Sequence, residues 1–235
     1  MAPMTGRAIE QGMGQGLMKL LTSGLQGEII YSFVIIACSL MIYFGTKELY
    51  KLSSHKGIKY FRLSFLFFAL AYFFRSFIKI ILFYLEMGEL RNVLPIFGSI
   101  TLFIFMYFSS MAIFHLLHSV MWKNWKSKFV TYTFHTISLI VAMLVLIFKN
   151  PNLYLSINLL FLFFISFIVY KSHKESRKKK PSNLYIIYLL LFVFWIFNII
   201  DTLIPSLLQT FQLLIYLISS GIFLVIFYKV IRKTG

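Results

Sequence analysis

The sequence is poor in cysteine, in acidic residues and in charge of any kind. It holds one cysteine, Cys38, so no disulfide can form within the chain and no paired-cysteine motif for metal or redox chemistry exists. Charged residues make up only 13% of the 235 residues, about half the share of a soluble domain. With 60% apolar residues, the chain cannot hide its apolar surface in one water-soluble globule of this size. The same composition excludes a disordered chain.

Long apolar runs take the place of the missing charge. A helix needs about 20 mostly apolar residues to cross a bilayer. Seven segments meet this requirement, and they cover residues 28–46, 62–85, 93–121, 129–148, 153–170, 184–204 and 207–228. The runs are continuous rather than alternating, which excludes a transmembrane β-barrel. The predicted fold class is an all-α membrane protein, a bundle of seven transmembrane helices located in the cell membrane as a multi-pass protein.

The lysines and arginines are unevenly distributed between alternate loops. Seventeen of the 23 follow the first, third, fifth and seventh spans, four lie on the other side, and two lie inside the second span. Because positive loops stay on the cytoplasmic side, we expect the amino terminus outside and the carboxyl terminus in the cytoplasm. This partition accounts for the net charge of +16 and the basic run 171–180. It predicts contact with anionic lipid headgroups at the cytoplasmic face and no nucleic-acid partner.

The first 27 residues differ in composition from the rest of the chain, because they are rich in Gly, Gln and Met. Ile9, Met13 and Leu17 recur at helical spacing, which indicates a short amphipathic helix on the outer leaflet. The segment lacks the uninterrupted apolar stretch of a secretory signal. We therefore divide the chain into an extracytoplasmic leader, residues 1–27, and a transmembrane domain, residues 28–235.

The first three and the last three spans can be aligned with one another. Tyr50-Lys51 falls against Tyr170-Lys171, Arg75 against Asn198, and Tyr107 with Ser109-Ser110 against Tyr216 with Ser219-Ser220. Each half then has three spans and one span connects them, so both halves have the same orientation in the membrane. The pattern indicates a parallel 3+1+3 repeat of the kind that some small transporters contain.

Charged residues lie inside two of the spans. Arg75 and Lys79 are four residues apart on the second span, and Asn198 and Asp201 are three apart on the sixth, so each pair shares a helix face. At about 1.5 Å per residue, Arg75 and Asn198 both lie about 20 Å from the inner end. Gln212 of the seventh span lies near the same level. Since charge inside a membrane is costly and by default functional, these residues predict a polar site in the outer third of the bundle.

This predicted polar site allows two interpretations. It is either a ligand pocket or a structural lock. In the pocket, Arg75 and Lys79 bind an anionic or carbonyl group, with Asp201 as counter-ion and Asn198 as an orienting amide. In the lock, an ion pair joins the second span to the sixth while Lys79 extends towards the outer headgroups. One positive charge is left over after Asp201 is paired, which favours a ligand, a lipid phosphate or Glu86 as its partner.

Three histidines form a second candidate site near the inner side. His115 and His118 are three residues apart on the third span, and His135 lies at a similar depth on the fourth. Imidazoles at one level could bind a metal, carry haem or relay protons. The alternative is hydrogen bonding between helices. No carboxylate is near enough in sequence to orient the imidazoles, so these are weak metal candidates and no cofactor is predicted.

The remaining features bear on function. Asp201 is the one carboxylate well inside a span, and no nucleophile–base pair is visible, so we expect no enzymatic activity. The last span contains no lysine that could hold retinal. The favoured interpretation is a receptor-like sensor or an accessory membrane subunit that acts through a membrane or cytoplasmic protein partner. The alternative is a small-solute transporter with its polar site in the outer half, against which the lack of Gly and Pro within most spans argues.

The orientation can be tested with reporter fusions. We expect a green fluorescent protein joined after Gly235 to fluoresce and an alkaline phosphatase at the same point to be inactive, because this terminus is predicted to be cytoplasmic. A phosphatase inserted after Lys149 should be active. Both signals are measured per amount of expressed fusion. The reverse pattern at both positions would contradict the orientation.

Overall fold

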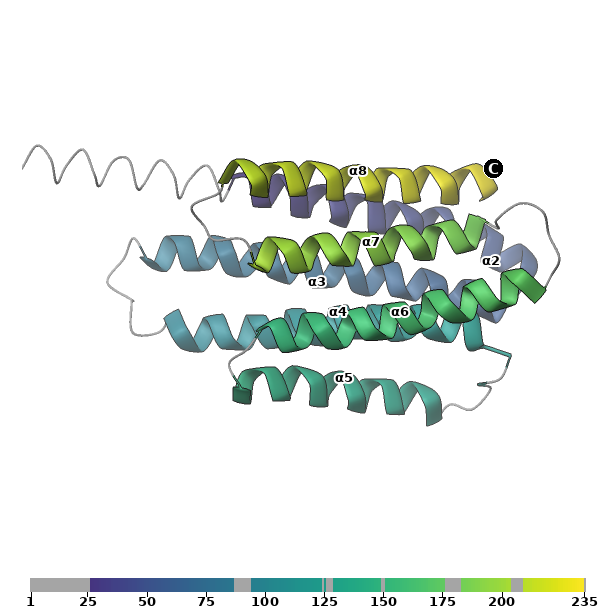
Figure 1. Cartoon of the computed structure of the whole chain (residues 1–235), viewed down its shortest axis with the longest axis horizontal. Coiled ribbons are helices and arrows are strands. Elements are labelled where there is room, and N and C mark those ends of the chain that lie inside the picture. Colours follow the sequence, from purple (N-terminus) through teal and green to yellow (C-terminus); the bar gives the residue numbers. More distant parts are fainter. Residues whose placement is uncertain are drawn as a thin grey trace, which may run out of the picture.

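The protein folds as a set of long helices, and the part that is described contains no strand. The computed structural model describes residues 26–86, 94–123, 125, 129–148, 151–175, 183–203 and 209–234. The first helix covers residues 26–45 and, after a turn at Thr46, continues as α2 (Lys47–Ser53). The helices that follow are α3 (Lys56–Glu86), α4 (Leu94–Met121), α5 (Phe129–Phe148), α6 (Pro151–Glu175), α7 (Asn183–Leu203) and α8 (Gln209–Thr234), and they lie side by side (Figure 1).

Every predicted span coincides with one of these helices. The bounds of α5 are those predicted, whereas α3 begins six residues before its predicted span. Helix α6 begins at Pro151, whose fixed φ and missing N–H suit the first position of a helix. Five of the described helices are long and apolar enough to cross a membrane, while α6 and α7 carry the shorter apolar stretches Leu155–Lys171 and Ile186–Asp201. The all-helical membrane bundle is thus confirmed, and its orientation stays a prediction.

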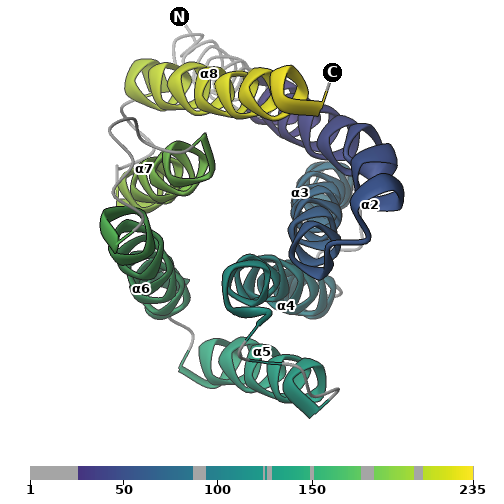
Figure 2. The same ribbon diagram turned by 90° about the vertical axis from the view of Figure 1, so that its right-hand side faces the viewer.

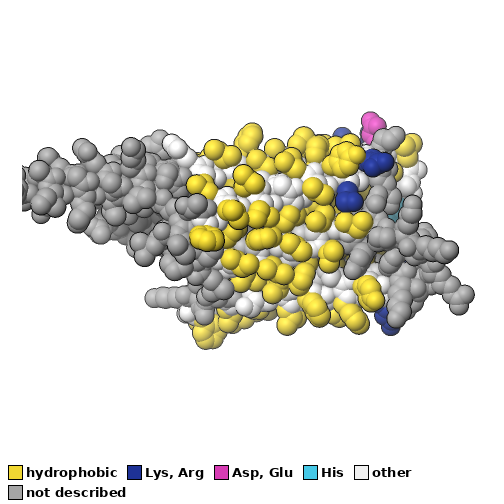
Figure 3. Space-filling view, turned by 45° about the horizontal axis from the view of Figure 1, so that its top comes forward, with side chains coloured by type: hydrophobic (Ala, Val, Ile, Leu, Met, Phe, Trp, Pro, Cys, Tyr) yellow, Lys and Arg dark blue, Asp and Glu magenta, His cyan; other side chains and the backbone are white. Residues whose placement is uncertain are grey.

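The outward-facing side chains match a lipid environment. Large apolar residues such as Phe33, Phe163 and Leu217 are more than 60% exposed. Figure 3 shows hydrophobic side chains over the middle of one face, with the Lys and Arg side chains of that view gathered towards one end. A soluble protein rarely exposes so large an apolar surface, whereas the hydrocarbon core of a bilayer requires one. Residues 1–25, which hold nearly all of the predicted leader, lie outside the described residues.

Six of the helices form a ring when the bundle is viewed along its length (Figure 2). The order around the ring is the first helix, α3, α4, α6, α7 and α8, and α5 lies outside it against α4. The ring of Tyr31 in the first helix stacks on that of Tyr216 in α8, with 4.8 Å between centroids, and this contact closes the circle. In this order the first helix and α6, α3 and α7, and α4 and α8 each stand three places apart around the ring.

The buried residues of the two halves support the predicted repeat. In the alignment that places Arg75 opposite Asn198, twelve buried residues of the first half match buried residues of the second, whereas the buried His115 and Leu116 match the exposed Leu224 and Val225. The matched pairs are Ile35–Leu155, Cys38–Asn158, Ile42–Leu162, Ser64–Ile187, Phe65–Tyr188, Phe68–Leu191, Ala71–Phe194, Tyr72–Trp195, Met106–Ile215, Ser110–Ser219, Phe114–Phe223 and Leu117–Ile226. Burial depends in part on residue type, so this match adds to the alignment without being independent of it. Together with the ring order, the alignment and the match favour a parallel 3+1+3 arrangement in which α5 is the connecting helix.

Aromatic side chains join the two halves in the interior. The ring of Phe68 in α3 lies 6.5 Å from that of Trp195 in α7 and 6.2 Å from that of Phe223 in α8. Phe194 and Phe223 meet edge to face at 4.7 Å. Between helices in lipid, such packing contacts replace the hydrophobic driving force that holds soluble cores together.

We expect Phe223→Ala to destabilise the bundle and Phe33→Ala to have little effect. Phe223 is fully buried between the halves, whereas Phe33 is 68% exposed on the outer surface. Loss of the buried ring should lower the free energy of unfolding by about 3 kcal/mol, the lower end of the range for a core phenyl group. The measurement is the thermal unfolding midpoint of each purified variant in the same detergent. Equal shifts of the unfolding midpoint for the two variants would show that the interior of the helix ring is not the packed core.

Candidate functional site

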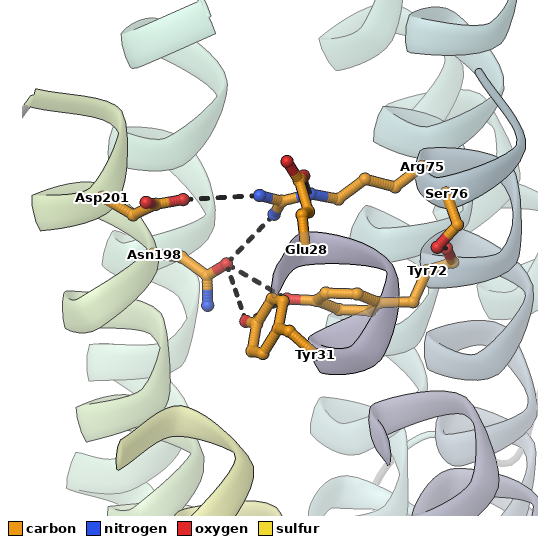
Figure 4. A network of polar contacts seen from close by, with 7 residues as sticks. All are labelled: Glu28, Tyr31, Tyr72, Arg75, Ser76, Asn198 and Asp201. Atoms are coloured by element: carbon orange, nitrogen blue, oxygen red, sulfur yellow. Dashed lines mark hydrogen bonds and ion pairs between the residues drawn. The ribbon is translucent and has the colours of Figure 1, made fainter. Parts of the chain in front are cut away.

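Arg75 of α3 is the centre of a polar cluster near the end of the bundle that is predicted to be outer (Figure 4). Its Nε donates a hydrogen bond to Oε1 of Glu28 in the first helix at 2.9 Å. Its Nη1 donates to Oδ1 of Asn198 at 3.3 Å, and its Nη2 donates to Oδ2 of Asp201 at 3.4 Å, both in α7. A single guanidinium group thereby joins three helices.

Two tyrosines complete the cluster from the side of the bundle interior. The hydroxyls of Tyr31 and Tyr72 lie 3.3 Å apart, and each donates to Oδ1 of Asn198, at 3.4 and 3.1 Å. The Asn198 amide nitrogen donates to the Phe194 carbonyl one turn earlier, at 2.9 Å, which fixes the orientation of the amide. The rings of Tyr31, Tyr72 and Phe105 lie within 6 Å of the Arg75 Cζ, close enough for cation–π attraction.

The charges of this cluster are well shielded from the exterior of the bundle. The side chains of Arg75, Glu28 and Asp201 are 17%, 6% and 10% exposed. Opposite charges attract more strongly in such a site than in water. Among the described side chains, one guanidinium group faces two carboxylates, so the charge of Arg75 is already compensated. The expected leftover positive charge is therefore not found on Arg75, because Glu28 supplies a second carboxylate that the sequence analysis did not count.

The residues predicted from sequence are partly brought together. Arg75, Asn198 and Asp201 meet as expected, although their role in ligand binding stays a prediction. Lys79 lies one turn beyond Arg75 in α3, but its side chain lies outside the described residues, as does that of Glu86. Gln212 is half-buried one turn from Tyr216 and, in the part of the chain that is described, makes no hydrogen bond to the cluster.

Sequence reasoning missed Glu28, Tyr31 and Tyr72. Glu28 and Tyr31 are three residues apart and therefore share a face of the first helix. Glu28 is the first residue of the predicted span 28–46, so the sequence analysis did not count it among the carboxylates well inside a span. Its depth, close to the predicted outer end like that of Asp201, is the one signal that could have identified it. The contact between the first helix and α3 that brings it to Arg75 is not visible in the sequence.

The three histidines have separate partners. His115 Nδ1 donates to the Met111 carbonyl at 2.9 Å, and His118 Nε2 donates to the Trp125 carbonyl at 3.2 Å. His135 Nδ1 is hydrogen-bonded to the Tyr107 hydroxyl at 2.5 Å. Within the described ranges, no group of three His, Cys, Asp or Glu side chains is placed to hold a metal ion. These contacts are of the interhelical and intrahelical kind that stabilises membrane bundles.

Comparison with known proteins gives one informative similarity. The chain is 31% identical over 215 residues to an uncharacterized protein of Archaeoglobus fulgidus (strain ATCC 49558 / DSM 4304 / JCM 9628 / NBRC 100126 / VC-16). The alignment covers 89% of this chain and 93% of that protein. No family model matches the sequence, and no solved structure matches the fold.

We expect Glu28→Gln to destabilise the protein more than Asp201→Asn. The Glu28 contact to Arg75 is shorter and more buried, and a hydrogen bond between charged groups contributes about 2 kcal/mol. Loss of the longer Asp201 contact should cost about 1 kcal/mol, the value of an ordinary hydrogen bond. Thermal unfolding midpoints in detergent measure both effects.

The matched control is a rescue experiment. Arg75→Ala alone removes the guanidinium group from two buried carboxylates, which should cost about 3 kcal/mol or more. Combining Arg75→Ala with Glu28→Gln and Asp201→Asn should recover most of that loss. If the triple variant is no more stable than Arg75→Ala, the three side chains do not form one electrostatic unit.

Proposed function

We infer the function of this chain from its own residues, because it belongs to the same family as the Archaeoglobus fulgidus protein and the name of that relative assigns no activity. The chain is a helical, membrane-embedded protein. We propose that it works by relative movement of two three-helix halves. One half is the first helix with α3 and α4, and the other is α6, α7 and α8. The Arg75 cluster is the clasp that holds their outer ends together.

The distribution of contacts within the clasp supports a movement of this kind. The 2.9 Å bond from Arg75 to Glu28 lies within the first half. The bonds to Asn198 and Asp201, at 3.3 and 3.4 Å, cross to the second half. Breaking a buried ion pair is costly when it leaves an unpaired charge. Because Glu28 moves together with Arg75, the halves can separate at the clasp without leaving the guanidinium alone.

We propose that the movement carries a small polar solute across the membrane. The observation that carries this proposal is the position of the polar contacts between two matched halves, which is where transporters built from repeats place their site. A second polar contact between the halves lies deeper, where Ser110 Oγ of α4 donates to Oδ1 of Asn158 in α6 at 3.3 Å. Since Arg75 is already neutralised, the site favours an uncharged or zwitterionic solute over an anion.

A receptor-like sensor or accessory subunit is the second candidate, and α2 favours it. This helix continues the first helix beyond the turn at Thr46, contains no buried residue and leaves Leu52 87% exposed. Because it is joined to the helix that carries Glu28 and Tyr31, it would move when the clasp opens. An exposed helix at the predicted cytoplasmic end could pass that movement to a protein partner.

The movement can be measured as a distance between the halves. Spin labels at Ile96→Cys in α4 and Phe211→Cys in α8, in a Cys38→Ser background, report the separation of the outer ends. We expect two distance populations in lipid, with the longer one enriched by Asp201→Asn because that variant loses a contact across the clasp. Leu189→Ala, a change at a lipid-exposed position of α7, is the matched control and should leave the populations unchanged. A single distance that Asp201→Asn does not alter would sink the proposal.

Transporter and receptor are then separated by two further measurements on the wild-type chain. Proteoliposome uptake of labelled glycerol, alanine and lactate tests a neutral, a zwitterionic and an anionic solute. Native mass spectrometry of the chain taken gently from its own membrane detects a protein partner. Uptake of glycerol or alanine that Asp201→Asn alters supports the transporter. A stoichiometric protein partner together with no uptake supports the receptor-like subunit.

A further inference from the structure

A second arginine in the same helix, Arg62, lies in surroundings that contrast with those of Arg75. Arg62 stands six residues after the start of α3, about 9 Å along the helix, near the end that is predicted to be cytoplasmic. It is 8% exposed. In the described part of the chain both ion pairs to a carboxylate belong to Arg75, and none involves Arg62.

One nitrogen of Arg62 has a partner within the protein. Its Nε donates to the Tyr43 carbonyl at 3.0 Å. That carbonyl lies in the last turn of the first helix, where the turn at Thr46 interrupts the helical pattern and Thr46 Oγ1 bonds the Ile42 carbonyl at 2.7 Å. A cation at the last carbonyls of a helix is favourable. Capping this helix end accounts for one of the five N–H groups of the guanidinium.

The rest of the guanidinium group is held in place but not neutralised. Its Cζ lies 4.8 Å from the ring of Tyr43 and 5.8 Å from that of Tyr50, which fixes its plane. Among the described residues, neither terminal nitrogen has a hydrogen-bond acceptor. Glu48 is the nearest acidic residue in sequence, but it is exposed in α2 and forms no ion pair with Arg62. The residue is largely buried, yet neither terminal nitrogen is among the fully enclosed polar atoms that lack a partner, so both are open to an anion from outside the chain.

The surroundings specify the chemistry of that anion. Lys47, Lys51 and Lys59 are exposed on the adjoining turns of α2 and α3, so the local charge is strongly positive. The two free nitrogens of a guanidinium group match two oxygens of a phosphate. At this depth, the phosphate nearest to the site is that of a lipid headgroup in the cytoplasmic leaflet.

We propose that Arg62 is the centre of a phosphate-binding site between the end of the first helix and the start of α3, and that the phosphate belongs to an anionic lipid headgroup. Tyr43 and Tyr50 hold the guanidinium plane, and the exposed lysines raise the local concentration of anions. A phosphate bound there would bridge the first helix, α2 and α3. The site is distinct from the clasp, so its test does not depend on the proposed transport.

The test is a lipid titration of the full-length chain followed by native mass spectrometry. The probes are phosphatidylglycerol, phosphatidylcholine and the water-soluble glycerol 1-phosphate. We expect Arg62→Gln to weaken the tightest phosphatidylglycerol site about tenfold, the loss of one charge-assisted contact. Lys171→Gln, which removes an exposed positive charge from the same predicted face in α6, should weaken it less than threefold. Arg62→Lys keeps the positive charge but loses the two-nitrogen geometry of the guanidinium group. Its affinity for phosphatidylglycerol should lie between those of the wild type and Arg62→Gln.

The outcomes separate the alternatives. Equal weakening by Arg62→Gln and Lys171→Gln, or no weakening by either, would overturn the proposal and leave Arg62 as a helix cap. Displacement of bound phosphatidylglycerol by glycerol 1-phosphate would retain the site but assign it to a soluble phosphate ester. If Arg62→Gln does not fold, the thermal unfolding midpoint of the wild type in the two lipids tests the site instead. Phosphatidylglycerol should then raise its thermal midpoint above that in phosphatidylcholine alone, and equal midpoints would contradict the site.

Discussion

The structure depends on the need of one buried guanidinium group for its counter-ions. Arg75 sits inside a bundle whose other interior side chains are mostly apolar, and an isolated charge would be strongly disfavoured there. Its three bonded nitrogens take partners from the first helix and α7, so these two helices and α3 must stay in register. Packing alone would let apolar helices slide or rotate against one another, whereas these directional bonds define one arrangement.

The two arginines of α3 show how the same side chain acquires different roles. Arg75 has two carboxylates and an amide within hydrogen-bond distance, so protein groups neutralise its charge. The guanidinium group therefore links three helices to one another. Arg62 has a carbonyl and two aromatic rings, so its position is fixed, while no carboxylate among the described residues pairs with it. A positive charge in a membrane helix is therefore not by itself an anion site. The carboxylates that surround it decide the role.

The position of the Arg75 cluster between the two predicted halves explains the role proposed for it. The helices of the two predicted halves follow the same order around the ring, and twelve buried positions match between the halves. Arg75 and Asn198 occupy equivalent positions in the predicted repeat and are bonded to each other at 3.3 Å, so the polar cluster joins the two predicted halves. In the proposed movement, this contact would resist a relative tilt of the halves and its loss would permit one.

The sequence by itself determined the helices, the charge partition and the depth of the polar residues. Spanning a bilayer requires about 20 consecutive apolar residues, which is a local property, and α5 begins and ends where it was predicted. The meeting of Arg75 with Asn198 and Asp201 could be predicted because depth follows from counting residues along a span. The tertiary structure alone decided which spans are neighbours, and so it alone brought Glu28, Tyr31 and Tyr72 to Arg75. When a membrane helix is apolar on every side, its residue pattern does not indicate which face contacts another helix. A leucine or phenylalanine side chain is equally stable against lipid and against protein.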